Sequence, residues 1–276
     1  MEAITAIWHR DVIKSLRDKA QLIGALSLPI LLLIIFGGGM GGAIKSLIEG
    51  AGISGPIVDF DFIKFMFPGI VAMTIFNTAV ISALSVVQDR EFGYLREMLV
   101  SPISRYSIVI GKVLGGSTTA VIQGLIILIA APFVGIAIKP VMILKLLPGM
   151  LVLAFTVSAL SLLVASFVKT SQGFHTALSM LILPMLFLSG SLFPLSGSPA
   201  WMSFLVKLNP VTYGVDMFKK ILLQGDSLSG ILQEVMGLNL QVLGYSLTVT
   251  ADFLLLLAIG IILTYLAAAR FKNAEA

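Results

Sequence analysis

Long apolar stretches alternate with shorter polar segments along almost the whole chain. The apolar stretches run over residues 21–43, 65–88, 113–138, 143–168, 173–193 and 250–269. Each is close to the length of about 20 mostly apolar residues that a helix needs to cross a bilayer. Backbone amides in lipid must be hydrogen-bonded within their own segment, and these stretches lack the alternation of barrel strands. The pattern predicts an all-α polytopic membrane protein, with six transmembrane helices in a single transmembrane domain, 1–276.

Two further segments have helical patterns without being spans. Residues 2–19 place apolar residues such as Ile7 and Trp8 on one face and basic residues on the other. This pattern predicts an amphipathic helix lying in the headgroup plane. Residues 194–249 are too apolar for a simple exposed loop and contain several prolines, among them Pro210. We expect short helices here that dip back toward the membrane.

Basic residues gather in the N-terminal segment, in the charged segment 89–112 and in the C-terminal tail. Short loops rich in lysine and arginine stay on the cytoplasmic side of a membrane. We therefore expect an integral membrane protein with both termini cytoplasmic. The net charge of +4 comes from residues that flank spans, which indicates contact with anionic lipid headgroups and no nucleic acid partner.

The composition agrees with this membrane assignment. Hydrophobic residues make up 58% of the chain and charged residues 12%, and the mean hydropathy is +1.04. Soluble domains are far less apolar. Cysteine is absent, which excludes disulfides, thiolate metal sites and a cysteine nucleophile.

Motifs for catalysis are missing from the chain. The dipeptide Gly111-Lys112 is followed by Val113 and has no glycine-rich loop before it, so there is no phosphate-binding P-loop. Neither a His-Glu-x-x-His zinc motif nor a Gly-x-Ser-x-Gly elbow is present. We expect a transport subunit without enzymatic activity of its own, with no cofactor and no metal on this chain.

Charge is also missing near the middle of the predicted spans. A stand-alone ion-coupled carrier usually has a buried charge there, and an intramembrane enzyme needs converging titratable groups. Both alternatives therefore have weaker support than a subunit that is energised by a partner.

Neutral polar residues gather on one side of the second predicted span. They are Thr74, Asn77, Thr78, Ser82 and Ser85. Such a side faces either other helices, through hydrogen bonds, or a substrate path, and the pattern favours the two about equally.

Three motifs, in order along the chain, resemble the type-2 ABC exporter permease family, which includes daunorubicin-resistance-type drug exporters. The first is Phe67-Pro68-Gly69-Ile70. The second runs from Glu91 through Gly93, Glu97, Leu99 and Ser101-Pro102 to Arg105 and Gly111-Lys112. The third runs from Ser189-Gly190 and Phe193-Pro194 to Leu208-Asn209-Pro210-Val211-Thr212-Tyr213-Gly214-Val215-Asp216.

This resemblance implies half of a transporter of the prokaryotic plasma membrane. A second permease subunit, identical or homologous, would complete the pathway, and a cytoplasmic ABC ATPase carrying ATP and Mg would drive it. The implied substrate is hydrophobic or amphipathic, a drug or a lipid-like molecule. A glycan or a lipid-linked glycan is the alternative.

The resemblance also assigns roles to segments. Residues 2–19 correspond to a connecting helix, 89–100 to a coupling helix that contacts the ATPase, and 195–222 to external re-entrant helices. The implied ATPase-coupling residues are Asp89, Arg90, Glu91, Gly93, Arg96, Glu97, Leu99, Ser101, Pro102 and Arg105. The implied external motif is Asn209, Pro210, Thr212, Tyr213 and Asp216. Lys219 stands where relatives often carry arginine, which keeps the charge but not the bidentate geometry.

One carboxylate in the expected coupling helix is unusual. If residues 89–100 form one continuous helix, Glu91 falls inside its apolar arc. A carboxylate in a packed face is costly unless it is paired. We expect a basic partner for Glu91, such as Arg105 or Lys112, or one on the ATPase. The alternative is that Glu91 simply reaches the headgroup boundary and water.

Overall fold

The computed structural model describes residues 2–35, 62–94, 104–136, 139–192, 199–223, 241–242 and 245–273. The helices of the first half are α1 (Glu2–Arg17), α2 (Lys19–Ile35), α4 (Phe62–Ser82), α5 (Leu84–Glu91) and α7 (Arg105–Leu128). After a short 3-10 helix (Ala131–Val134) follow α8 (Pro140–Phe167), α9 (Ser171–Leu188), α10 (Ala200–Leu208), α11 (Pro210–Leu223) and α13 (Val249–Asn273). Two antiparallel two-residue strands, β1 (Gln241–Val242) and β2 (Tyr245–Ser246), precede α13.

Five helical runs in the described part are long and apolar enough to cross a membrane. They are Ile63–Glu91, Arg105–Phe133, Pro140–Phe167, Ser171–Leu188 and Val249–Phe271. Helices α1 and α2 meet at a bend of 71° and bring the number of spans to six if they are taken as one broken span. The expected all-α polytopic fold is confirmed.

The observed ends of the helices differ from the predicted ranges, most clearly at α7. This helix begins at Arg105 rather than at 113, because Ser104 caps it by accepting a hydrogen bond from the Ser107 amide. Hydropathy misses this first part because it contains Arg105 and Lys112. The first predicted span, 21–43, is described only as far as Ile35.

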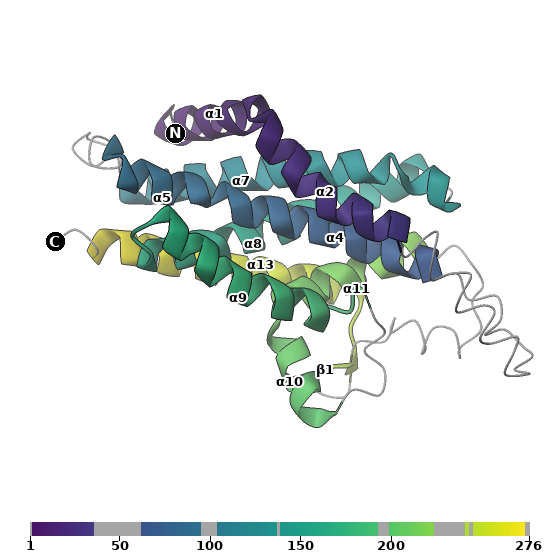
Figure 1. The fold of residues 1–276 in the computed structure, drawn as a ribbon. Helices are drawn as coiled ribbons and strands as arrows, with labels where there is room; N and C mark the ends of the chain where they lie inside the picture. Colours follow the sequence, from purple (N-terminus) through teal and green to yellow (C-terminus); the bar gives the residue numbers. More distant parts are fainter. Residues whose placement is uncertain are drawn as a thin grey trace, which may run out of the picture.

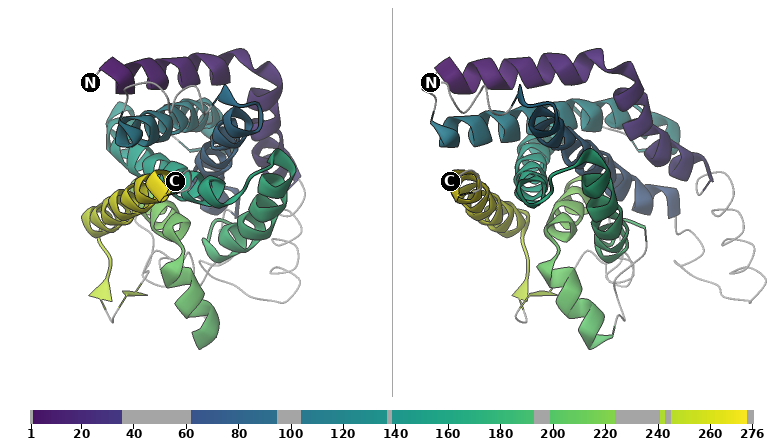
Figure 2. Two further views of the ribbon diagram at one scale, coloured as in Figure 1. Left: turned by 90° about the vertical axis from the view of Figure 1, so that its left-hand side faces the viewer. Right: turned by 60° about the vertical axis from the view of Figure 1, so that its left-hand side comes forward.

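Helices α4, α7, α8 and α13 form the body of the bundle, and α11 packs against α4, α8 and α13 (Figure 1). Phe65, Phe67, Phe76 and Phe218 are among the fully buried side chains of this core. Helices α1 and α2 form a bent pair at one edge, and α10 projects from the opposite edge (Figure 2).

Two glycines let α1 approach α7 closely. A Cβ atom at Gly111 would lie 2.9 Å from the Ile7 side chain, and one at Gly115 would lie 2.9 Å from Asp11 Cβ. Small residues four positions apart are typical of closely packed membrane helices. Trp8 adds a hydrogen bond from Nε1 to Thr118 Oγ1 at 2.9 Å. The amphipathic N-terminal helix is therefore docked tightly on the bundle.

The segment expected to form external re-entrant helices, 195–222, contains α10 and α11, and residues 193–198 lie outside the described part. Every residue of α11 is buried, whereas α10 exposes Trp201, Phe204 and Leu208. Pro210 opens α11, a position where a helix tolerates proline. Thus α11 is a core element, and only α10 lies at the surface.

Candidate functional site

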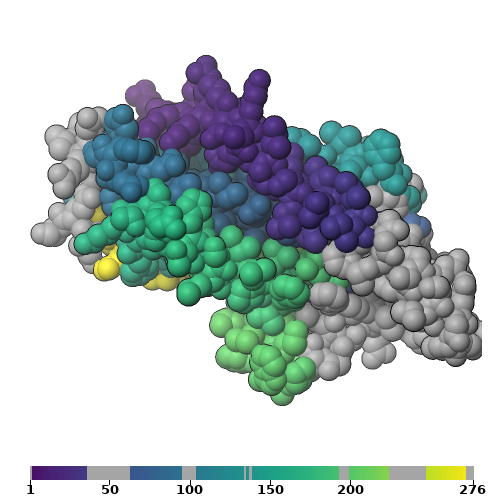
Figure 3. Space-filling view, in the orientation of Figure 1, coloured from purple at the N-terminus to yellow at the C-terminus, as the bar shows by residue number. Residues whose placement is uncertain are grey.

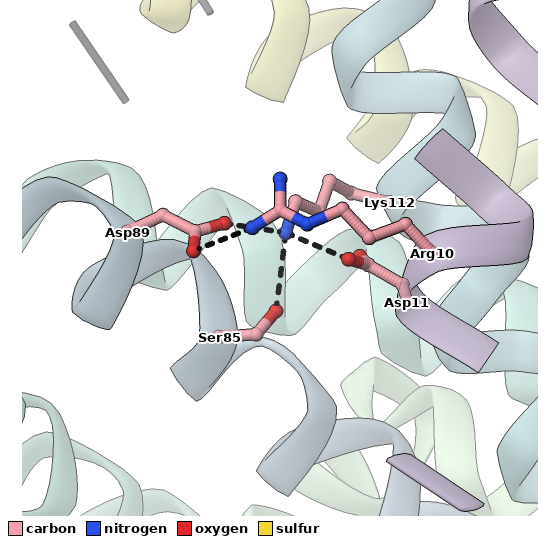
Figure 4. Close-up of polar contacts among 5 residues, drawn as sticks. All are labelled: Arg10, Asp11, Ser85, Asp89 and Lys112. Atoms are coloured by element: carbon pink, nitrogen blue, oxygen red, sulfur yellow. Dashed lines mark hydrogen bonds and ion pairs between the residues drawn. The ribbon is translucent and has the colours of Figure 1, made fainter. Parts of the chain in front are cut away.

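An ion-pair network joins α1, α5 and α7 at one end of the bundle (Figure 4). Lys112 Nζ lies 2.8 Å from Asp89 Oδ2 and 3.0 Å from Asp11 Oδ1, and 3.4 Å from Ser85 Oγ. Arg10 Nη2 lies 3.1 Å from Asp89 Oδ1. The Lys112 side chain is only 4% exposed and that of Asp89 3%. Burial of these charges is tolerable because each has partners of opposite sign.

The next residue of α5, Arg90, reaches the end of α8. Its Nη1 atom donates to the carbonyl oxygens of Ala165 at 3.2 Å and Val168 at 2.8 Å. A cation at the C-terminal end of a helix satisfies its free carbonyl groups and is stabilised by the helix dipole. The guanidinium also lies 5.9 Å from the centre of the Phe271 ring on α13. Arg90 therefore connects α5 with two other helices.

Glu91 contacts the beginning of α9. Its Oε2 atom accepts hydrogen bonds from the Ser171 amide, at 3.2 Å, and from the Ser171 hydroxyl. A carboxylate at a helix N-terminus is favoured by the dipole. The prediction that Arg105 or Lys112 pairs with Glu91 is wrong for the described residues. Glu91 is exposed at the end of α5. Arg105 instead donates to the Phe271 carbonyl oxygen at 3.3 Å.

The prediction of one continuous helix over 89–100 is wrong at its beginning. Helix α5 ends at Glu91, Phe92 is its C-cap, and Gly93 has a φ of 83°. Glycine adopts this left-handed conformation without steric cost, so the chain turns here. The helical wheel that placed Glu91 in an apolar arc fails for this reason. Arg96, Glu97, Leu99, Ser101 and Pro102 lie outside the described residues.

Four charged residues flank the segment 92–104, and we call them the loop-flanking residues. They are Asp89, Arg90 and Glu91 before the segment and Arg105 after it. Their side chains contact the ends of α8, α9 and α13 as well as α1 and α7. Phe92 and Tyr94, at the beginning of the segment, are 71% and 54% exposed. A displacement of the loop-flanking residues would therefore pull on five helices.

The polar side of the second span divides into two groups. Thr74 bonds to the Ile70 carbonyl oxygen, and Thr78 bonds to the Thr74 carbonyl oxygen and to Gln123 Oε1. Both are buried, so their polarity is satisfied within and between helices. Asn77 donates to the Ala25 carbonyl oxygen on α2 at 3.4 Å.

Ser82 and Ser85, by contrast, line a cavity of about 300 Å³ between the α1–α2 bend, α4, α5 and α7. Their assignment to a substrate path stays a prediction.

Two residues of the expected external motif, Asn209 and Thr212, bond to the end of α9. Asn209 Nδ2 donates to the Met185 carbonyl oxygen at 2.6 Å, and Thr212 Oγ1 donates to that of Leu188 at 3.2 Å. Tyr213 Oη donates to the Lys207 carbonyl oxygen at 2.6 Å. Pro210, between them, begins α11. The motif thus holds the α10–α11 turn against α9.

A second cluster of charges was missed by sequence reasoning. It comprises Asp216, Lys219 and Lys220 on α11 and Asp252 on α13, and we call it the α11 cluster. Lys220 Nζ pairs with Asp216 and lies 3.0 Å from Asp252 Oδ2. Lys219 Nζ donates to the Gly190 carbonyl oxygen at 2.7 Å and lies 3.7 Å from the centre of the Phe65 ring. The sequence does contain one signal for this cluster, the four-residue spacing of Asp216 and Lys220. This spacing places two opposite charges on one face of an apolar helix.

Within the described ranges, no three His, Asp or Glu side chains are grouped so that they could hold a metal ion.

The family model described as "ABC-2 type transporter" matches residues 2–223. A putative transport permease ycf38 of Cyanophora paradoxa is 30% identical over 218 residues, which cover 78% of this chain and 72% of the relative. The ycf38 protein of Pyropia yezoensis is 31% identical over 224 residues, with the same two shares. The probable multidrug ABC transporter permease YbhR of Escherichia coli K12 is 29% identical over 177 residues, 62% of this chain and 46% of the relative.

Proposed function

Because this chain belongs to the ABC-2 type transporter family, we propose that it is the membrane subunit of an ATP-driven exporter of hydrophobic or amphipathic molecules. The family implies embedding in the membrane and association with an ABC ATPase. A second copy or a homologue completes the export pathway, and the ATPase holds the ATP and Mg. The name of YbhR, a probable multidrug ABC transporter permease, supports a drug as substrate.

The observation that carries this proposal is the set of contacts made by the loop-flanking residues. The segment between α5 and α7 is the place where the ATPase docks, on the cytoplasmic side. Movement of the segment on ATP binding is transmitted by Asp89 to α1 and α7, by Arg90 to α8 and by Glu91 to α9. The whole bundle responds because these contacts are hydrogen bonds of charged groups, which are stronger than neutral ones and more specific in geometry.

We expect Arg90→Met to uncouple the complex of this subunit and its ATPase. The substitution removes two hydrogen bonds from a charged group, each typically contributing about 1.5–3 kcal/mol. ATP-driven uptake of daunorubicin into inside-out proteoliposomes should fall roughly tenfold or more, with ATP hydrolysis reduced less.

The matched control is Arg17→Met, because Arg17 is exposed at the end of α1 and its substitution should leave transport unchanged. The subunit without its ATPase should neither hydrolyse ATP nor transport. Hydrolysis by the pure subunit, or wild-type uptake by Arg90→Met, would contradict the proposal.

The proposed orientation gives a separate prediction for thiol labelling. Because the chain lacks cysteine, single cysteines report their own position. Ser104→Cys, at the start of α7, should react with an impermeant maleimide only from the cytoplasmic side. Ala200→Cys, three spans later at the start of α10, should react only from outside. Reaction of both positions from the same side would refute this topology.

A further inference from the structure

The cavity of about 300 Å³ that Ser82 and Ser85 line, here called the elbow cavity, lies under the bend between α1 and α2. Its other walls come from α4, α5 and the first half of α7. In Figure 3 the purple atoms of α1 and α2 lie against the blue atoms of α4 and α5. This volume is at the lower end of the range for ligand pockets, roughly 300–1,000 Å³.

Several polar side chains of the elbow cavity have unused bonding capacity. Lys14 and Gln88 line it, and neither side chain has a hydrogen bond or ion pair within the described part of the chain. Asp18 Oδ1 accepts from the Gln21 amide at 3.0 Å, and the second oxygen accepts no hydrogen bond from any described residue. Asp11 is different, because Lys112 already neutralises it.

Lys14 and Asp18 present two charges of opposite sign to the elbow cavity. Lys14 and Asp18 are four residues apart, yet no ion pair joins them among the described residues. A purely anionic ligand would be repelled by Asp18, and a purely cationic ligand would be repelled by Lys14. A group that carries both signs satisfies the two residues together, while the Gln88 side-chain amide donates to its neutral oxygens.

The surroundings favour a ligand with an apolar tail. Helix α2, which supplies Gln21 to the elbow cavity, exposes Ile23, Leu31 and Ile34 by 69%, 52% and 64%. Exposed apolar side chains on a membrane helix contact acyl chains. A polar head in the elbow cavity therefore places its tail beside the hydrocarbon layer.

We propose that the elbow cavity binds the zwitterionic headgroup of an amphipathic lipid, an ammonium group joined to a phosphate, as in phosphatidylethanolamine. Lys14 binds the phosphate and Asp18 binds the ammonium group. The lipid is either a resident of the membrane or the exported molecule itself. Binding of the lipid does not depend on the proposed export activity. Only its identification as the exported molecule rests on that activity.

The test measures retention of fluorescent phosphatidylethanolamine and fluorescent phosphatidylglycerol by the purified complex of subunit and ATPase. The wild type should retain the ethanolamine lipid in preference. Asp18 caps the start of α2 through its bond from the Gln21 amide. Asp18→Asn keeps this cap, because asparagine caps as well as aspartate, but removes the charge. It should lose roughly fivefold in affinity for the ethanolamine lipid and approach equal binding of the two lipids, as expected for one partly exposed ion pair.

Lys14→Gln should weaken binding of both lipids, because both carry phosphate. Lys19→Gln and Glu2→Gln are the controls: both residues are exposed on the same two helices and neither lines the elbow cavity. Equal retention of the two lipids by the wild type, or an Asp18→Asn variant that keeps the preference, would overturn the proposal.

A flipping assay in proteoliposomes identifies the source of the lipid. ATP-dependent movement of the ethanolamine lipid, lost in Asp18→Asn, supports binding of the exported molecule. Selective retention without ATP-dependent movement supports binding of a resident lipid. Failure of daunorubicin uptake in the same vesicles would count against the exporter assignment while leaving the retention result in place.

Discussion

Replacing Lys220 by methionine is expected to lower the free energy of unfolding of the subunit by about 3–5 kcal/mol, the usual cost of removing one partner from a buried ion pair. Lys220 Nζ contacts Asp216, Asp252 and, at 2.8 Å, the Leu247 carbonyl oxygen. One oxygen of each of these carboxylates is already buried with no hydrogen-bond partner among the described residues. Without the ammonium group the two negative charges would repel each other across the α11–α13 interface.

The measurement is the unfolding free energy in mixed micelles at pH 7. Lys207→Met is the control, because Lys207 is exposed on α10 and its change should cost well under about 1 kcal/mol. Adding Asp216→Asn and Asp252→Asn to Lys220→Met should recover part of the loss by removing the uncompensated charges. A Lys220→Met variant as stable as the Lys207→Met control would show that the α11 cluster contributes nothing to stability.

Lys112→Met is expected to release α1 from the bundle. The ammonium group of Lys112 is the shared partner of Asp11 on α1 and Asp89 on α5. Its removal leaves both carboxylates buried near each other, at a cost of about 3–5 kcal/mol. Separation of α1 from α7 relieves this repulsion, because Asp11 then becomes hydrated.

Exposure of α1 can be measured with a cysteine at Ile7, which is 9% exposed against α7. The labelling rate of Ile7→Cys should rise at least tenfold in the Lys112→Met background. This rise is expected if the separation of α1 from α7 relieves most of the energetic cost of removing the Lys112 ammonium group. Lys19→Met, an exposed lysine on α2, serves as the matched background and should leave the rate unchanged. An unchanged rate in Lys112→Met would mean that the remaining contacts of α1 hold it without Lys112; these are the glycine packing, the Trp8–Thr118 hydrogen bond and the Arg10–Asp89 pair.

Much of the fold was predictable from hydropathy because lipid imposes a simple rule on each segment by itself. The stretch 143–168 became α8, Pro140–Phe167, and the stretch 250–269 lies within α13, Val249–Asn273. The same rule failed at Arg105 and Lys112. Their charges end an apolar run in the sequence, but the helix continues through them because Asp11, Asp89 and Phe271 satisfy them.

The candidate site was only partly predictable for a similar reason. The charges of Asp89, Arg90 and Glu91 mark a segment that cannot lie in lipid, and the motifs around them pointed to the family. The partners of Arg90 and Glu91 come from residues 75 or more positions away, Ala165 for Arg90 and Ser171 for Glu91. Gly93 turns the chain where a uniform helical wheel was assumed.

Sequence alone determined the membrane class, the approximate spans, the absence of a P-loop and the family, since each depends on residues in one segment or on an ordered set of short motifs. Only the tertiary structure decided where the charges go. It buried α11 inside the bundle and paired Lys220 with Asp252, 32 residues away, and it left Lys14 and Asp18 beside an open cavity. A buried charge is tolerated only next to its partner, and which helices become neighbours is decided by packing that no local pattern records.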